Sequence, residues 1–318
     1  MFGGVGSGIG VLGVLLAIGL YMVEVITRPK KRSIFDEYTF SPFELGLPAE
    51  NVTFAPISGD YRVNGWFVPY PGATTTILVC PGYRTGKADM LGISTKLWNA
   101  GHNVLVFEYY GHGTDIAPVT LGYRELNDFL GAVAYAKERA PETCLGVMAY
   151  SMGASIAIIG SVRSKDIEAL VLDSAFASHW SVIDYHVRRA FPLPSAPFVW
   201  MADQLMWWRA KYRFHQVEPL RDIRKLAPRP VLLIHGGKDS IVDPRDATLL
   251  YEAAGEPKEL WFFPEAEHCG AYFIDRPAYC ERVTAFFELY LKKPRLQLVE
   301  NKSEEQVETS TQDLSAAS

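Results

Sequence analysis

"GVMAYSMGAS", residues 146–155, is the stretch that decides the fold of this chain. Apolar and small residues run up to Ser151, and a pattern typical of the first turn of a helix follows. A serine becomes a nucleophile only when it projects from the backbone and a base takes its proton. A sharp strand-to-helix turn achieves this when the residues two before and two after the serine are small, as in G-x-S-x-G. Ala149 and Gly153 occupy those positions, so the stretch predicts a buried strand, an exposed Ser151 and a helix.

Two further loops carry the groups that a serine nucleophile needs. A serine at this point can also be a simple helix N-cap, so these loops decide between the two interpretations. Asp239 in "HGGKDSIVDP" follows one apolar run, and His268 in "EAEHCG" follows the last one. The order Ser, Asp, His places each residue at the carboxyl end of its own expected strand, where ligands bind in open α/β sheets. We therefore predict that Ser151 is the nucleophile, His268 the general base and Asp239 the acid that orients it. Asp243 remains a rival acid.

The loop "CPGYRTG" (80–86) follows the first long expected strand. It can offer a backbone N–H group to a developing oxyanion. The helix that begins after Ser151 also points unpaired N–H groups and its positive dipole end at the reaction site. We therefore expect the backbone N–H groups of Met152 and Tyr83 to form the oxyanion hole.

Three other polar side chains near these motifs have a structural explanation. His112 in "YYGHG" and His235 are expected to brace their own turns rather than act as second bases. Arg84 lies beside the oxyanion loop, where a surface salt bridge is favoured over contact with an anionic substrate group.

Short apolar runs alternate with amphipathic segments through most of the chain. Several runs are apolar on both faces, which is typical of a parallel sheet covered by helices. The expected strands are 76–80, 103–109, 144–150, 169–175, 231–237 and 259–266. The expected helices are about 87–100, 120–140, 152–163, 244–254 and 276–292. This alternation predicts a doubly wound, mostly parallel α/β sheet. Upstream, "NVTFAPI" and "GWFVPY" predict a hairpin of two antiparallel edge strands.

The alternation breaks once, over about 176–219. This stretch is aromatic and helical in pattern, with a Pro-rich joint, and it contains four of the seven tryptophans. We expect a helical cap over the carboxyl edge of the sheet, where ligands bind in open α/β folds. A pair of packing helices without a ligand role is the alternative.

These motifs together resemble the α/β-hydrolase superfamily. Within it, the chain is similar to single-domain serine hydrolases of the serine-aminopeptidase-like group. The resemblance covers about residues 45–292 and rests on "CPGYRTGKADM", "NVLVFEYYGHG", "GVMAYSMGAS", "LVLDSAFAS", "HGGKDSIVDP" and "EAEH". It implies an α/β-hydrolase fold with a cap insertion and the triad named above. The oxyanion loop departs from the usual His-Gly, since Pro81-Gly82 stands there.

The composition excludes several classes of protein. The chain has 318 residues, of which 48% are hydrophobic and 21% charged, so it is long enough for one large α/β domain. A net charge of −5 gives no basic field for nucleic acid. The four cysteines show no C-x-x-C or zinc spacing, so we expect free thiols in a reducing compartment and no metal or cofactor. Cys269 adjoins His268, but sequence neighbours point different ways, so it is not expected to be the nucleophile.

The two ends of the chain differ in composition from this domain. Residues 2–23 carry no charge and are long enough to cross a hydrocarbon core of about 30 Å. Basic residues follow at once. We therefore expect a single transmembrane anchor over 1–27 and a juxtamembrane linker over 28–44, with the catalytic domain on the cytoplasmic side. A Gly-rich start that packs against the domain is the alternative. The polar residues 293–318 are expected to form a disordered tail.

The expected function is hydrolysis of an ester or thioester through an acyl-enzyme at Ser151. The aromatic cap and the expected anchor favour a small-molecule substrate with an apolar acyl chain, close to a membrane. A peptidase would use the same triad, and a non-catalytic binding protein can share the fold. A dehalogenase needs a carboxylate where Ser151 stands. The sequence leaves the oligomeric state and the physiological substrate open.

Overall fold

The structure is a computed structural model. It describes residues 41–112, 117–190 and 194–291, together with ten positions near the N-terminus: 13, 16, 17, 19–21, 23, 24, 27 and 28. The expected tail over 293–318 lies outside these residues, as does most of the expected linker, although Pro42–Leu45 forms a short 3-10 helix, η1.

An eight-stranded sheet forms the centre of the molecule. Its strands are β1 (Glu50–Phe54), β2 (Val63–Val68), β3 (Thr75–Cys80), β4 (Asn103–Phe107), β5 (Cys144–Tyr150), β6 (Ile167–Asp173), β7 (Val231–Gly236) and β8 (Lys258–Phe263). Their order is β1-β2-β4-β3-β5-β6-β7-β8. The hairpin β1–β2 is antiparallel and pairs antiparallel with β4, whereas all remaining pairs are parallel. The expected strands and the edge hairpin are confirmed.

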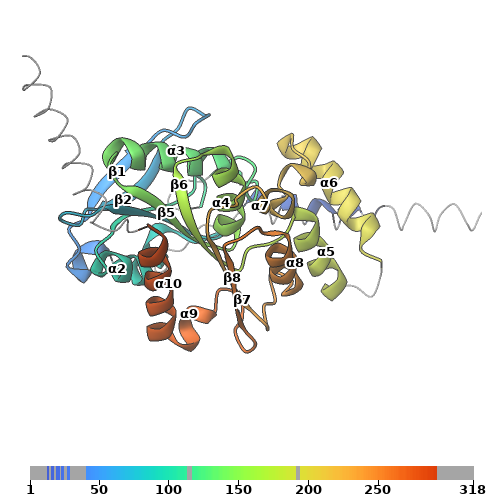
Figure 1. The fold of residues 1–318 in the computed structure, drawn as a ribbon. Helices are drawn as coiled ribbons and strands as arrows, with labels where there is room; N and C mark the ends of the chain where they lie inside the picture. The colour runs from blue at the N-terminus through green and yellow to red at the C-terminus, as the bar shows by residue number, and fades with distance from the viewer. Residues whose placement is uncertain are drawn as a thin grey trace, which may run out of the picture.

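Helices cover both faces of the sheet (Figure 1). The longer ones are α2 (Leu91–Asn99), α3 (Glu125–Arg139), α4 (Met152–Arg163), α5 (His179–Ala190), α6 (Ala196–Ala210), α8 (Arg245–Ala253) and α10 (Arg276–Leu291). Short helices are α7 (Pro219–Ile223), α9 (Ala271–Ile274), η2 (Lys87–Met90) and η3 (Phe214–Gln216). Helices α3, α4, α7 and α8 share one apolar core with the sheet, and α2 and α10 share the core on the other face. The inner strands β3, β4 and β7 are therefore buried along their whole length.

Helix α3 begins five residues later than expected. The carboxylate of Glu125 accepts hydrogen bonds from the backbone N–H groups of Thr120 (2.7 Å) and Gly122 (2.9 Å). These bonds hold residues 120–124 in a turn, so the buried Glu125 becomes the first helical residue.

Helices α5 and α6 form the cap over the carboxyl end of the sheet, at the right of Figure 1. They have an apolar core of their own, which includes Ile183, Val187, Phe198 and Val199. The expected break in the strand–helix alternation is therefore a pair of helices beside the central sheet.

The expected membrane localisation is wrong for the part of the chain that the structure describes. No helix built from those residues is both long enough and apolar enough to cross a membrane. Most of the expected anchor over 1–27 lies outside the described residues. Val23, which belongs to that segment, is 5% exposed and packs in the apolar core of the cap. An apolar residue there is buried by protein, which a hydropathy pattern cannot distinguish from burial by lipid.

Candidate active site

Ser151 lies at the sharp turn between β5 and α4. Its backbone adopts φ 52° and ψ −119°, a conformation that residues with a side chain rarely adopt. The Ser151 N–H group donates to the carbonyl oxygen of Asp173 at the end of β6 (2.7 Å), which holds the turn in place. The hydroxyl therefore stands at the carboxyl edge of the sheet, in front of the first turn of α4.

The small residues two before and two after Ser151 are required for different physical reasons. A Cβ atom added to Gly153 would clash with the carbonyl oxygen of Pro81 and lie 2.8 Å from that of Cys80. Only glycine lets α4 approach the end of β3 this closely. Ala149 is fully buried in β5, where its methyl group is part of the core against α3 and α4.

His268 stands between Ser151 and Asp239. Its Nε2 atom lies 2.8 Å from the Ser151 hydroxyl oxygen, and its Nδ1 atom lies 2.7 Å from the Asp239 carboxylate. Because a carboxylate only accepts, Nδ1 carries the proton in this arrangement and Nε2 is left to accept the serine proton. Three residues from loops after β5, β7 and β8 are thus within hydrogen-bond distance in the order that the sequence predicts.

Asp239 is held by its own loop. Its Oδ1 atom accepts the backbone N–H groups of Ile241 (2.9 Å) and Val242 (2.8 Å), so Oδ2 faces His268. The carboxylate is fully buried, and these bonds compensate its lost hydration. The rival acid Asp243 instead accepts the N–H and Nε–H groups of Arg245, both at 3.0 Å. The neighbouring Arg245 guanidinium lowers the pKa of Asp243.

The expected oxyanion donors lie beside Ser151. Met152 is the first residue of α4, so its N–H group has no partner within the helix. The loop after β3 runs close to Ser151, since a Cβ atom on Gly82 would lie 3.2 Å from Cβ of Ser151. Tyr83 follows in that loop, and Tyr83 and Ser151 line one pocket. The role of both N–H groups stays a prediction.

The two histidines and the cysteine near the motifs are packed into the structure, whereas Arg84 is exposed. His112 lies edge-on to the rings of Tyr83 and Tyr109, and burial lowers its pKa. His235 is buried behind the acid, with Nε2 3.4 Å from the Asp239 carboxylate. Burial raises the pKa of the Cys269 thiol well above its usual value, which keeps it protonated. Arg84 lines the pocket.

Sequence reasoning missed a buried carboxylate behind the histidine loop. Asp173 ends β6 and accepts hydrogen bonds from the hydroxyl groups of Ser174 (2.9 Å) and Tyr279 (2.7 Å). Ser174 in turn accepts the N–H group of Cys269 (3.1 Å), directly after His268. Burial raises the pKa of Asp173 to about 6, although both hydroxyl groups oppose the shift. A polar residue at the end of "LVLD" is a signal in the sequence, but its partner Tyr279 lies 106 residues away.

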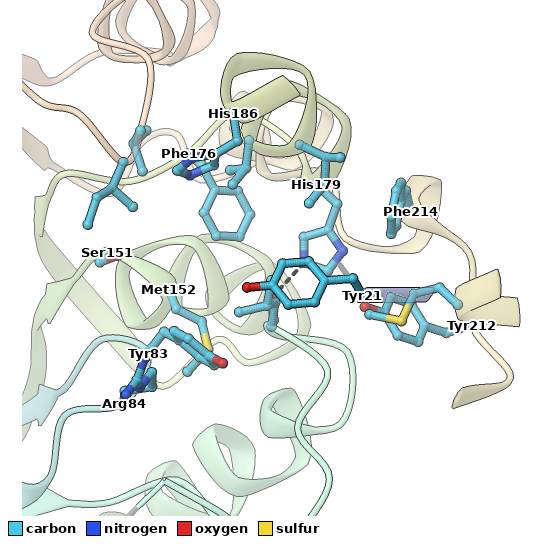
Figure 2. Close-up of a pocket in the computed structure, with 16 residues that line it drawn as sticks. Tyr21, Tyr83, Arg84, Ser151, Met152, Phe176, His179, His186, Tyr212 and Phe214 are labelled. Atoms are coloured by element: carbon cyan, nitrogen blue, oxygen red, sulfur yellow. Dashed lines mark hydrogen bonds between the residues drawn. The ribbon is translucent and has the colours of Figure 1, made fainter. Parts of the chain in front are cut away.

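A pocket of about 590 Å³ opens in front of Ser151 and extends under the cap (Figure 2). Its walls come from the loop after β3, from the start of α4 and from the cap, and Tyr21 of the N-terminal segment also lines it. Most of the lining is apolar or aromatic. Within the described residues, no group of three or more histidine, cysteine or acidic side chains could hold a metal ion.

Comparisons with known proteins agree with this architecture. No family model matches the chain. YqkD of Bacillus subtilis, a protein described as uncharacterized, is 28% identical over 285 residues, which are 86% of this chain and 93% of YqkD. The esterase Pf2001 of Pyrococcus furiosus has a similar structure, with a TM-score of 0.68 and 23% identity over 84% of this chain and 98% of its own. An acylaminoacyl peptidase of Pyrococcus horikoshii matches with a TM-score of 0.58 and 14% identity, over 78% of this chain and 42% of its own. The sheet order of this chain, its flanking helices and its structural neighbours together show that it has the α/β-hydrolase fold.

Proposed function

We propose that this chain is a serine hydrolase that cleaves carboxylic ester or thioester bonds. The observation that carries the proposal is the continuous set of contacts from the Ser151 hydroxyl through His268 to Asp239, at 2.8 and 2.7 Å. Ser151 lines a mostly apolar pocket, where a substrate carbonyl can reach the hydroxyl.

The reaction proceeds in two steps. Ser151 Oγ attacks the carbonyl carbon while His268 Nε2 takes its proton, and the oxyanion receives hydrogen bonds from the N–H groups of Met152 and Tyr83. His268 then protonates the departing alcohol or thiol, which leaves an acyl group on Ser151. Water, deprotonated by His268, attacks this ester, and the acid is released as the proton returns to Ser151. Asp239 balances the positive charge of His268 in both steps.

The pocket favours an apolar acyl chain over a peptide with a free amino terminus. An aminopeptidase needs an acceptor for the ammonium group of its substrate. None of the described residues that line the pocket is acidic, whereas aromatic and aliphatic side chains predominate. A volume of about 590 Å³ accommodates a chain of several carbons.

The test combines active-site labelling with a substrate panel. We expect a fluorophosphonate probe to label the wild type and not Ser151→Ala. We expect p-nitrophenyl esters and matching thioesters of increasing chain length to be hydrolysed, with kcat lowered about 10⁶-fold in Ser151→Ala. Aminoacyl p-nitroanilides, run in parallel, separate a peptidase from an esterase. A folded wild type that is neither labelled nor active on any ester would show a non-catalytic protein on a hydrolase fold.

A further inference from the structure

Two buried polar side chains lie on the cap side of the pocket. His179, the first residue of α5, and Tyr212, which follows α6, both line the pocket. Figure 2 shows them together with Phe214, on the opposite side of the pocket from Ser151 and Met152. Their side chains are 2% and 0% exposed, respectively, so each is cut off from bulk water.

The protonation of His179 is set by its surroundings. Its Nε2 atom lies 2.7 Å from the carbonyl oxygen of Leu121 and therefore donates a hydrogen bond. Burial lowers the pKa of His179 to about 4, so the ring is neutral at pH 7. In that tautomer Nδ1 is an acceptor, and it has no hydrogen-bond partner among the described residues.

The hydroxyl group of Tyr212 also has no hydrogen-bond partner in the described part of the chain. The ring stacks on Tyr123 at a centroid distance of 4.9 Å and meets the His179 ring edge-on at 5.8 Å. These contacts fix the phenol beside the imidazole. Buried polar groups in native proteins usually have a partner. Among the buried side-chain atoms of the described residues that have none, only those of His179 and Tyr212 belong to the pocket lining, where a ligand can supply one.

The other histidine of the pocket lining differs in this respect. His186, about two turns further along α5, is exposed, so water can pair with its ring nitrogens. It lines the same pocket but needs nothing from a ligand.

We propose that the substrate carries a hydroxyl group on the apolar chain that enters the pocket, and that His179 and Tyr212 recognise it. This inference rests on the proposed function. A hydroxyl group can both donate, as Nδ1 of His179 requires, and accept, as the phenol of Tyr212 requires. A methyl group satisfies neither. A carboxylate has no proton for Nδ1 and finds no cationic partner in a neutral imidazole. The substrate class is therefore a hydroxyacyl ester or thioester.

The kinetic test uses pairs of p-nitrophenyl esters that differ only in a hydroxyl group on the terminal carbon, over acyl chains of about six to ten carbons, which do not readily close to a lactone. At the matching length we expect the wild type to prefer the hydroxylated ester about tenfold or more in kcat/KM. His179→Leu is expected to abolish this preference, and Tyr212→Phe to reduce it. His186→Leu, the same change at the exposed histidine of the same pocket, is expected to keep it.

A binding test separates this inference from the proposed function. Ser151→Ala holds the same ester pairs without turnover, and calorimetry is expected to show about tenfold tighter binding of the hydroxylated member. Loss of that difference in Ser151→Ala/His179→Leu, with near-UV circular dichroism unchanged, would support the site. Equal or weaker binding of the hydroxylated ester at every chain length would overturn the inference, even where the wild type hydrolyses both esters. Preferential binding without hydrolysis by the wild type would instead overturn the proposed function alone.

Discussion

The two sides of the pocket differ in how their polar groups are paired. Beside Ser151, the hydroxyl, both nitrogens of His268 and both oxygens of Asp239 have partners within the described protein. Beneath the cap, His179 Nδ1 and the Tyr212 hydroxyl have none there. Groups that pair with one another keep their geometry before a substrate arrives, which is what catalysis requires. Groups left for a ligand add discrimination instead, because a ligand that lacks the matching atom leaves them unpaired.

The largest expected effect tests the pairing on the catalytic side. Asp239→Asn should lower kcat on a p-nitrophenyl ester about 10⁴-fold, because an amide favours the wrong tautomer of His268 and does not balance its charge. Asp243→Asn makes the same change four residues later, where the carboxylate contacts Arg245. It should change kcat less than about threefold, because the Asp243 carboxylate pairs with Arg245 and not with His268. Equal losses in the two variants would contradict the assignment of Asp239 as the acid.

The next effect concerns the backbone that presents Ser151. Gly153→Ala adds a methyl group against the carbonyl oxygens of Pro81 and Cys80. We expect urea denaturation to show a free energy of unfolding lower by about 3 kcal/mol, together with weaker fluorophosphonate labelling. Ala149→Gly places glycine at the other small position of the turn. This change should lower the free energy of unfolding by only about 1 kcal/mol and leave fluorophosphonate labelling unchanged. A loss of stability as large as that of Gly153→Ala would show that the turn tolerates neither change.

The catalytic side was also the more predictable one. Strands that are apolar on both faces identify a parallel sheet, and loops at the carboxyl ends of its strands must meet at one edge. The contacts among Ser151, Asp239 and His268 therefore follow from the order of three motifs. Their catalytic roles still depend on the experiments above.

Other features depend on contacts between distant segments, which a local pattern does not contain. Val23 lies in an uncharged run whose pattern predicts a membrane anchor, yet it packs against the cap. Asp173 reads as the end of a strand, and only the fold brings Tyr279 to it. The unpartnered atoms of His179 and Tyr212 are likewise visible only when the surroundings of each ring are known.

A smaller effect, on the pH dependence of stability, is expected from Asp173, the buried carboxylate behind the loop that carries His268. The pKa of Asp173 is about 6 in the folded protein, against an ordinary value of 3.8, so folding favours its protonated form. The corresponding stability is present below about pH 4 and is lost as the pH rises through 6. The two pKa values differ by about 2, which corresponds to a change in the free energy of unfolding of at most about 3 kcal/mol. Asp173→Asn does not titrate, so its free energy of unfolding relative to wild type should rise by about 2 kcal/mol between pH 4 and pH 7. A difference that stays flat with pH would show that Asp173 titrates normally.

The smallest effect tests whether the two sides of the pocket are independent. The Tyr185 hydroxyl on α5 donates to the backbone carbonyl oxygen of Asp239 (2.8 Å), which ties the cap to the loop of the acid. Because the Asp239 carboxylate is already held by Ile241 and Val242, Tyr185→Phe should lower kcat/KM only about two- to fivefold, the value of one hydrogen bond. Tyr290→Phe, on α10, is the matched control and should leave kcat/KM unchanged. If Tyr185→Phe instead lowered kcat/KM a hundredfold, the cap would be positioning Asp239. The contacts around Ser151 would then depend on the cap side of the pocket.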